Sequence, residues 1–467
     1  MDSAVIHFDR ERPLYLQIYE HFRTEITSGR LREGERVPAI RQLAQELSVS
    51  KITVERAYDQ LCGEGYITSA NRARYRVASL EEMPAFPVRE GHRAAPPEAA
   101  PPIRYDFASG EMDPEGFDFR IWRRYLSRTL QDAPRLMRYG QPQGEPELRA
   151  ELARYVRSAR GVPADASQIL VGPSAQSLLG MLCALLGEEY GSIAFEEPGF
   201  RHGRQIFEDH RFHILPIPMQ KNGISPKALL ESGARLAYIS PSHQFPTGFV
   251  MPAGMRSRLL AWARQADALI VEDDYDSEFR YYGSPIPALK GMDGDDRVIY
   301  LGSFSKILPP SIRIGFMVLP EKLLERFRKR GSLYNQAAST AEQLALAAFM
   351  ADGELERQVR RLRGRYQEKR RVFLEAIHAS FGEGAVTQDG GTGLFVPVQV
   401  PGALPVAEMK QRARRAGCRI AALQDYALTP LPGQQGKLLL LYFSSIPRGE
   451  LAAAVKALHT AFEGSPG

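Results

Sequence analysis

Short apolar runs alternate with amphipathic stretches between residues 105 and 463. Runs with the length and composition of buried strands lie at 169–171, 192–195, 236–239, 268–271 and 298–301. An alternation of strands and helices is typical of a parallel sheet that is covered by helices. We therefore predict an α/β fold for this part of the chain.

A different pattern occupies residues 1–78, where amphipathic helical stretches follow one another closely. In residues 13–28 the apolar positions recur every four residues, at Leu14, Ile18, Phe22 and Ile26. Helical patterns follow at 38–47 and 51–64, and Ser50 is placed to cap the second of them. Two short helices joined by a tight turn predict a helix-turn-helix, whose second helix enters the major groove of DNA.

Residues 66–68 and 75–77 have the pattern of two short strands, which predicts a wing after the helices. Its tip carries Arg72 and Arg74, which are suited to phosphate or minor-groove contacts. Residues 36–76 hold 7 basic and 4 acidic side chains, whereas residues 1–78 hold 12 and 11. Charge gives little support to DNA binding, and a small helical domain is the alternative interpretation.

Residues 79–104 are rich in proline and show no apolar periodicity. Such a composition predicts a semi-rigid, extended linker. We therefore predict a winged helix-turn-helix domain at 1–78, a linker at 79–104 and an α/β domain at 105–467.

The composition is that of an ordinary globular protein: 467 residues, 44% hydrophobic, 25% charged, with a net charge of +5. No apolar run approaches the roughly 20 residues that a membrane-spanning helix needs. The N-terminus lacks the features of a secretory signal, and Cys62, Cys183 and Cys418 have no paired spacing. We expect a cytoplasmic protein with reduced thiols, no membrane contact and no metal site.

The segment VPAIRQLAQELSVSKITVERAYDQLCGEGYI resembles the winged-helix domain of the GntR regulators, and the likeness extends over residues 12–78. The resemblance implies that promoter DNA is contacted by Arg41, Ser50, Lys51, Thr53 and Arg56. The wing departs from the family, because a Gly-rich tip is usual and this chain has ANRARYR.

The segment IYLGSFSKILPPSIRIGF contains a strand that ends in a Ser-rich turn and exposes Lys306. A lysine held at a strand end can lose its proton by desolvation and form a Schiff base with an aldehyde. The hydroxyls of Ser303 and Ser305, together with Arg313, are suited to hold a phosphate. Pyridoxal 5′-phosphate (PLP) combines an aldehyde with a phosphate, so the sequence predicts PLP as the cofactor.

In the segment LIVEDDYDSEFRY, an apolar strand delivers Asp273 and Tyr275 on one face, because they are two positions apart. A buried carboxylate at Asp273 would keep the pyridine nitrogen of PLP protonated, and the Tyr275 hydroxyl would bond its phenolate oxygen. The neighbouring Asp274, Asp276 and Glu278 are expected to be solvated.

Three further segments supply candidate contacts. A strand, a small-residue turn and a helix follow one another at 169–186, and the first backbone N–H groups of that helix would cradle a phosphate: Ser174, Ala175 and Gln176. Phe200 follows a Pro-Gly turn, where an aromatic ring can stack on a flat cofactor. Tyr139 lies in a Gly/Pro turn before another predicted helix.

Taken in this order, the segments resemble the fold-type I PLP enzymes of the aspartate aminotransferase group over residues 105–463. With the GntR-like domain and the linker, the chain is identified as a member of the MocR subfamily of GntR transcription regulators. The resemblance implies a mixed, mostly parallel sheet with helices on both faces and a smaller C-terminal α/β subdomain.

The same resemblance assigns roles to the candidate residues. It implies that Lys306 forms the Schiff base, that Asp273 binds the pyridinium and that Tyr275 binds the phenolate oxygen. Ser303 and Arg313 would hold the phosphate. Phe200 would stack on the ring, and Tyr139 would reach the phosphate of a neighbouring subunit, which implies a homodimer.

Two positions depart from the aminotransferases. Phe245 replaces the asparagine that precedes Pro-Thr-Gly, with His243 or Gln244 as possible substitutes. Leu440 aligns with the arginine that usually binds the substrate carboxylate. The alternative cations for that role are Arg201, Arg204, Arg419 and Lys437.

We therefore expect a transcription regulator that senses a small amine or amino acid by aldimine exchange at Lys306, with slow or absent transaminase turnover. A functional aminotransferase that carries a winged helix is one alternative. A regulator of vitamin B6 synthesis that senses PLP itself is another.

Overall fold

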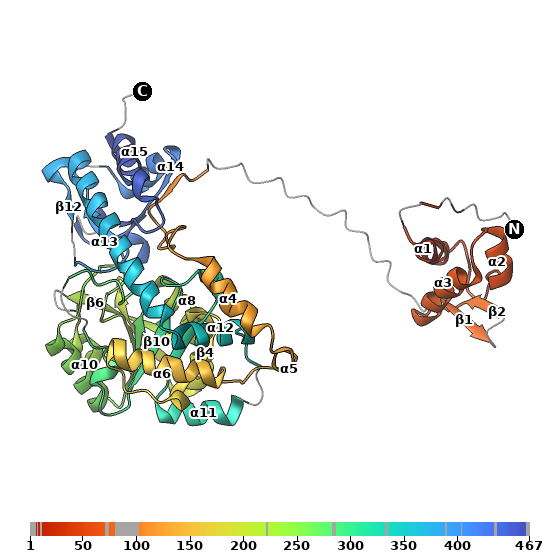
Figure 1. Ribbon diagram of the computed structural model, residues 1–467, viewed down its shortest axis with the longest axis horizontal. Coiled ribbons are helices and arrows are strands. Elements are labelled where there is room, and N and C mark those ends of the chain that lie inside the picture. The colour runs from red at the N-terminus through yellow and green to blue at the C-terminus, as the bar shows by residue number, and fades with distance from the viewer. Residues whose placement is uncertain are drawn as a thin grey trace. The chain divides into compact units, whose positions relative to one another are not determined.

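The computed structural model describes residues 6, 8–9, 12–70, 74–79, 102–220, 223–282, 286–331, 335–387, 390–402, 404–433 and 437–463. The chain forms two compact units, Met1–Ala99 and Ala100–Gly467 (Figure 1). Residues 80–101 of the predicted linker and Arg72 of the predicted wing tip lie outside the described residues.

The first unit packs helices α1 (Leu14–Thr27), α2 (Ile40–Glu46) and α3 (Lys51–Gly63) against the hairpin of β1 (Ile67–Ala70) and β2 (Arg74–Val77). The strands are antiparallel, with Ile67 opposite Val77. Tyr58 of α3 is fully buried, and its ring contacts Phe22 and Tyr75 edge to face. The predicted winged helix-turn-helix is confirmed.

The centre of the second unit is an eight-stranded sheet of order β4-β11-β10-β9-β8-β5-β6-β7. The bounds are Ile169–Gly172 (β4), Ser192–Glu197 (β5), His213–Gln220 (β6), Gly223–Ile224 (β7), Leu236–Ile239 (β8), Leu269–Asp274 (β9), Val298–Ser303 (β10) and Gly315–Val318 (β11). The inner strands pair in parallel, whereas β11 is antiparallel to both its neighbours and β7 is antiparallel to β6. The predicted mixed, mostly parallel sheet is confirmed.

Helices cover both faces of this sheet, because alternate strand residues point to opposite sides (Figure 1). Val271 of β9 joins a core with α7 (Ala175–Leu186), α8 (Arg201–Asp209) and α11 (Glu321–Gly331). Ile270 joins a second core with α9 (Pro226–Glu231) and α10 (Ala253–Gln265). The helices α4 (Phe119–Thr129), α6 (Pro146–Arg160) and α12 (Thr340–Ala351) contribute to a third core, and the short α5 (Ala133–Leu136) lies between α4 and α6 in the sequence.

A smaller C-terminal part contains a four-stranded antiparallel sheet of order β12-β13-β16-β15. Its strands are Val386–Thr387 (β12), Phe395–Gln399 (β13), Ala421–Ala422 (β15) and Leu439–Tyr442 (β16). The associated helices are α13 (Glu354–Phe381), α14 (Val406–Arg415) and α15 (Leu451–Glu463). The strand β3 (Tyr105–Asp106), at the start of the second unit, pairs in parallel with β14 (Cys418–Arg419).

The topology brings two chemically distinct segments to one edge of the large sheet. Strands β9 and β10 are parallel neighbours, with Asp273 opposite Leu301, so their carboxyl ends meet. The segment with Asp273 and Tyr275 and the segment with Lys306 both leave the sheet at this edge. Among the described helices, none is long and apolar enough to cross a membrane.

Candidate functional site

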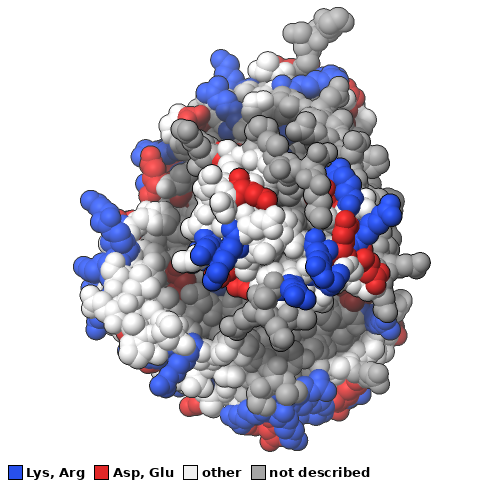
Figure 2. Space-filling model, turned by 90° about the vertical axis from the view of Figure 1, so that its right-hand side faces the viewer, with Lys and Arg blue, Asp and Glu red and all other residues white. Residues whose placement is uncertain are grey.

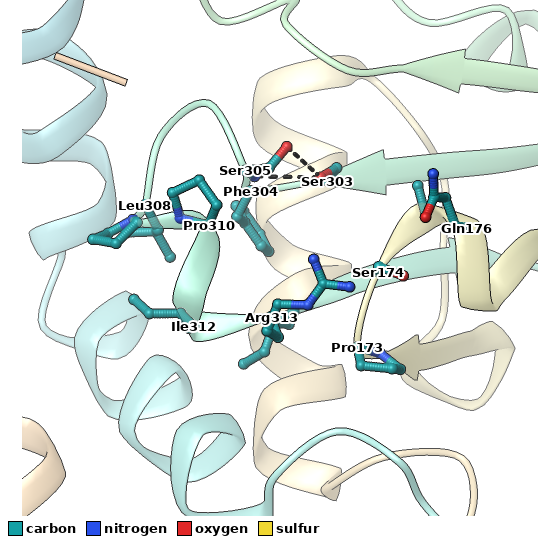
Figure 3. Close-up of a pocket in the computed structure, with 13 residues that line it drawn as sticks. Pro173, Ser174, Gln176, Ser303, Phe304, Ser305, Leu308, Pro310, Ile312 and Arg313 are labelled. Atoms are coloured by element: carbon teal, nitrogen blue, oxygen red, sulfur yellow. Dashed lines mark hydrogen bonds between the residues drawn. The ribbon is translucent and has the colours of Figure 1, made fainter. Parts of the chain in front are cut away.

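A pocket of about 260 Å³ lies beside the Ser-rich turn that follows β10. Ser303, Ser305, Arg313 and the start of α7 line it together. Figure 3 shows the Arg313 side chain reaching into the space between the serine turn and the first turn of α7. Of the predicted phosphate contacts, the structure therefore brings together Ser174–Gln176, the two serines and the arginine.

The first turn of α7 presents backbone donors to this pocket. Ser174 caps the helix, since its Oγ accepts a hydrogen bond from the N–H of Ser177 at 3.1 Å. The first N–H groups of a helix have no carbonyl partner within it, and the helix dipole favours an anion there. Across the pocket, the Ser303 hydroxyl donates to the Ser305 hydroxyl at 3.0 Å. Hydroxyls, free N–H groups and a guanidinium form a suitable cradle for a phosphate.

Lys306 is half-buried beside this pocket, and its Nζ donates a hydrogen bond to the carbonyl oxygen of Gly110 at 2.6 Å. Burial lowers the pKa of Lys306 below its ordinary value, although the negative charges of Asp276 and Glu111 oppose the shift. A lowered pKa increases the fraction of neutral, nucleophilic amine at neutral pH.

Asp273, at the end of β9, is buried and accepts a hydrogen bond from the Tyr238 hydroxyl on β8 at 2.6 Å. Burial raises the pKa of Asp273 to about 7, with smaller contributions in the same direction from the charges of Asp274 and Asp276. The bond from Tyr238 opposes this rise. A cation next to Asp273 would therefore strongly favour its ionised form.

The Tyr275 hydroxyl lies 3.0 Å from Nδ1 of His243, which also lies 2.8 Å from a carboxylate oxygen of Asp276. His243 and Asp276 are both buried. Burial raises the pKa of Tyr275 well above its ordinary value. The sequence suggested His243 only as a replacement for an asparagine, whereas the structure makes it the residue that positions the Tyr275 hydroxyl.

The expectation that Asp274, Asp276 and Glu278 are solvated was wrong. Asp274 and Asp276 are buried, and a buried carboxylate needs a partner. Asp274 Oδ2 accepts from Arg160 and from the Tyr300 hydroxyl, each at 2.6 Å.

The other two carboxylates each have a partner that is distant in the sequence, although Oε2 of Glu278 has none within the described part of the chain. His243 contacts Asp276, and the Tyr155 hydroxyl donates to Glu278 at 2.6 Å. Their partners come from elements far away in the sequence, and local polarity alone did not indicate them.

Phe200 directly precedes α8, and its ring stacks at 22° on that of Tyr238 with 6.1 Å between centroids. Since Tyr238 also bonds Asp273, Phe200 belongs to the same cluster. Tyr139, in contrast, is 85% exposed and does not line the pocket of its own chain.

Gln244 and Leu440, which the sequence analysis named where this chain departs from the aminotransferases, are both buried. Gln244 donates to the backbone oxygens of Pro198 and Phe245, at 3.0 and 2.7 Å, and also approaches Glu196 at 3.3 Å. Leu440 is fully buried in β16.

Two of the four alternative cations are already paired with carboxylates. Arg204 is buried, with Nη1 at 2.6 Å from Glu197, and Arg419 binds Asp106. Arg201 is exposed on the first turn of α8.

Glu196, at the end of β5, was missed by sequence reasoning. Burial raises its pKa to about 8, and its Oε1 has no hydrogen-bond partner within the described part of the chain. An apolar strand that ends in two glutamates gave a signal for it, but the strand pattern alone did not separate a buried from a solvated acid.

In the first unit, the residues predicted to contact DNA lie around the turn between α2 and α3. Arg41, Ser50, Lys51 and Arg56 are exposed, and Thr53 is half-buried. Ser50 also caps α3, because its Oγ accepts from the N–H of Thr53 at 3.2 Å.

Two more features of this unit bear on DNA contact. Ile52 is 64% exposed next to Lys51, where an apolar side chain can meet a thymine methyl group. Arg74 is exposed on the wing, whereas the guanidinium of Arg76 binds the carbonyl oxygen of Gly34. Figure 2 draws one side of the whole chain, on which Lys and Arg side chains lie among Asp and Glu side chains.

Each of the two units matches a known protein family. Residues 14–77 match the family described as bacterial regulatory proteins, gntR family, and residues 104–428 match aminotransferase class I and II. The chain is 38% identical to the HTH-type transcriptional regulator YhdI of Bacillus subtilis (strain 168), over 93% of this chain and 91% of that protein. It is 32% identical to the probable rhizopine catabolism regulatory protein MocR of Rhizobium meliloti, over 98% and 95% of the two chains.

The solved structure of α-aminoadipate aminotransferase LysN from Thermus thermophilus, complexed with N-(5′-phosphopyridoxyl)-L-leucine, superposes with a TM-score of 0.67. The identity is 25%, over 77% of this chain and 92% of that one. The protein is thus a transcription regulator that combines a helix-turn-helix domain with an aminotransferase-like domain. The chain belongs to the MocR subfamily of the GntR regulators.

The residues of this chain fit PLP. The pocket at Arg313 has donors for a phosphate, and Asp273 offers a buried carboxylate for a ring cation. A Cβ atom at Gly110 would lie 2.8 Å from Lys306 Nζ and 2.7 Å from Cε1 of Tyr442, so a glycine is needed to leave room at the lysine.

We predict that Asp273 makes the stability of the cofactor-free protein depend on pH. An acid whose pKa is higher in the folded than in the unfolded state stabilises the fold at low pH, and this contribution is lost as the pH rises to the folded pKa. For Asp273 the window runs from the ordinary value of 3.8 to about 7. Between pH 5 and 7, the free energy of unfolding should fall by roughly 1–2 kcal/mol more in the wild type than in Asp273→Asn.

Urea titrations followed by tryptophan fluorescence report on the second unit, because Trp122 and Trp262 both lie there. Asp209→Asn, at an exposed carboxylate that ends α8, is the control and should behave as wild type. Equal pH dependence in Asp273→Asn and the wild type would contradict the prediction.

Proposed function

We propose that this protein is a homodimeric, PLP-dependent regulator that binds promoter DNA through its winged helix and senses a small amine or amino acid at Lys306. The observation that carries the proposal is the position of Lys306. It is a half-buried amine with a lowered pKa, beside an anion cradle and a buried carboxylate, in a chain that also has a winged helix.

PLP, when bound, supplies an aldehyde carbon at which an effector amine can replace Lys306 in a Schiff base, so that one C–N bond forms, another breaks and no oxidant or reductant is needed. The chain itself supplies the fixed charges around that exchange. Arg313 and the start of α7 hold an anion, Asp273 holds a ring cation, and His243 fixes the direction of the Tyr275 hydroxyl.

Release of Lys306 gives the second unit two states that differ in effector affinity, which is sufficient for regulation. We propose that Tyr139 completes the phosphate site of a second subunit, since it is exposed and lies outside the pocket of its own chain. Residues 79–104 would connect the units as a linker. A DNA-binding role assigns the protein to the cytoplasm.

The first test of this proposal is the attachment site of the cofactor. Borohydride reduction of the PLP-loaded protein, followed by peptide mass mapping, should place the pyridoxyl group on Lys306. Lys306→Ala should lose the visible absorbance band, whereas Lys322→Ala, at an exposed lysine on α11, should keep it. A label on another residue, or no label with excess PLP, would exclude Lys306 as the cofactor lysine.

A second test concerns DNA. Fragments that the intact protein selects from a random pool should bind more weakly to Arg41→Ala and Lys51→Ala. Loss of a base contact costs about 1–3 kcal/mol and relaxes the sequence preference at one position, whereas loss of a phosphate contact reduces the salt slope by about 1.

Arg30→Ala is the matched control for these variants, because Arg30 is exposed in the turn after α1 and pairs with Glu25. If the second unit alone retains the selected DNA as well as the whole chain does, the winged helix is not the DNA-binding element.

The third test concerns the subunit that supplies Tyr139. Tyr139→Ala should lower PLP affinity about tenfold, a loss of about 1.4 kcal/mol, while Tyr282→Ala, at another exposed tyrosine, should not. Mixing Tyr139→Ala with Lys306→Ala should restore high-affinity sites, because the Lys306→Ala subunit supplies the missing tyrosine. A monomer with full PLP affinity, or no restoration on mixing, would contradict the shared site.

A further inference from the structure

The C-terminal sheet presents an apolar face at the position where aminotransferases usually bind a substrate carboxylate. Phe395 pairs with Tyr442, and Pro397 pairs with Leu440, across strands β13 and β16. Because directly opposite residues share a face of an antiparallel sheet, and so do residues two positions apart, these four side chains lie together.

This face is turned toward Lys306. A Cβ atom at Gly110 would meet both Tyr442 and Lys306 Nζ, within 2.8 Å of each. A Cβ atom at Gly248 would lie 3.6 Å from Pro397 and 3.9 Å from Phe395, so the loop that contains Phe245 packs against the same face.

Further aromatic rings adjoin this sheet face. Phe245 contacts Tyr426 edge to face with 4.8 Å between centroids, and it lies 6.1 Å from both Tyr275 and Phe395. Phe245, Tyr275 and Tyr426 are half-buried, so part of each ring is not covered by the chain itself. We call Phe245, Tyr275, Phe395, Tyr426 and Tyr442 the aromatic wall.

The charges near this wall disfavour a carboxylate. Asp276 and Glu111 act on Lys306 in the direction that opposes the effect of its burial. They attract an approaching ammonium ion and repel a carboxylate on the same carbon. Placing that carboxylate against Leu440, without a cationic partner, would add a desolvation penalty.

The buried Arg204, next to Tyr426 of the aromatic wall, already has hydrogen-bond partners. Arg204 binds Glu197, and it also donates to the carbonyl oxygen of Tyr426 at 2.6 Å. The exposed Arg201 acts on the Tyr426 hydroxyl from the side of α8, and it is the residue of this chain to test as a carboxylate anchor.

We infer that the site at Lys306 takes a primary amine whose amine-bearing carbon has no carboxylate and whose body is an aryl or branched alkyl group that packs on the aromatic wall. This inference rests on the proposed function and narrows its effector from amines and amino acids to decarboxylated, apolar amines. Rings such as those of the wall attract both apolar surface and cationic groups.

The test is a set of absorbance titrations of the PLP-loaded protein at one pH with matched pairs of ligands. One pair is 2-phenylethylamine and L-phenylalanine, and the other is 3-methylbutylamine and L-leucine. Within each pair the amine should reach half-saturation at a concentration about tenfold lower than the amino acid. Each ratio is corrected by the ratio that the same pair gives with free PLP, which removes differences in amine basicity.

Variants test whether Leu440 and the aromatic wall cause the preference for an amine over the matching amino acid. Leu440→Arg should lower the half-saturating concentration of L-phenylalanine about tenfold, because a guanidinium can bind the carboxylate through two hydrogen bonds. Leu230→Arg, at an exposed position of α9, adds the same charge elsewhere and should keep the wild-type preference. Phe245→Leu should weaken 2-phenylethylamine more than 3-methylbutylamine.

The wild-type titrations decide the question even if Leu440→Arg does not fold. An amino acid that exchanges at the same or a lower corrected concentration than its amine overturns this inference and leaves the proposed function intact. If Arg201→Gln then abolishes that exchange, Arg201 is the carboxylate anchor. A protein that binds PLP at Lys306 but responds to neither member of a pair overturns the inference too, and absence of any label on Lys306 overturns the proposed function with it.

Discussion

The burial of charged side chains at the carboxyl end of β9 is the constraint on which the rest of the site depends. Asp273, Asp274 and Asp276 lie within four positions, and all three are buried. An uncompensated charge in a protein interior costs several kcal/mol, so each carboxylate requires a partner from another element. Tyr238 and His243 supply two of these partners.

These partners fix the surroundings of the lysine. Tyr238 on β8 ties the end of β9 to its neighbour, and His243 joins the loop after β8 to both Asp276 and Tyr275. Asp273 and Tyr275 are thus held by hydrogen bonds to β8 and to the loop that follows it. Under the proposed function, such a frame would orient PLP with little reorganisation, and exchange of one amine for another would require little more of it. A full transamination also requires a substrate that is held in one orientation, and the fully buried Leu440 gives no charged anchor for that.

The two units have separate hydrophobic cores. The helices and wing of the first unit pack around Tyr58, whereas the second unit has its own cores on both faces of the large sheet. Each unit can therefore be altered without dismantling the other. Under the proposed function, coupling between them would be a difference in effector affinity between two states of the protein, and by reciprocity DNA binding would change that affinity as well.

The sequence by itself determined the alternation of strands and helices, the helix-turn-helix and the shared face of Asp273 and Tyr275. These features follow from local rules: apolar periodicity, helix capping at Ser50 and the two-residue spacing of Asp273 and Tyr275. Which side chains are buried, and which of them pair, depends on residues that are far apart in the sequence. Tyr238 and Asp273 are 35 positions apart, and Arg160 and Asp274 are 114 apart, so only the tertiary structure decided that the acidic segment is buried. It likewise decided that Tyr442, which shares a sheet face with Leu440, approaches Lys306 at Gly110, because strand pairing sets which side chains share a face.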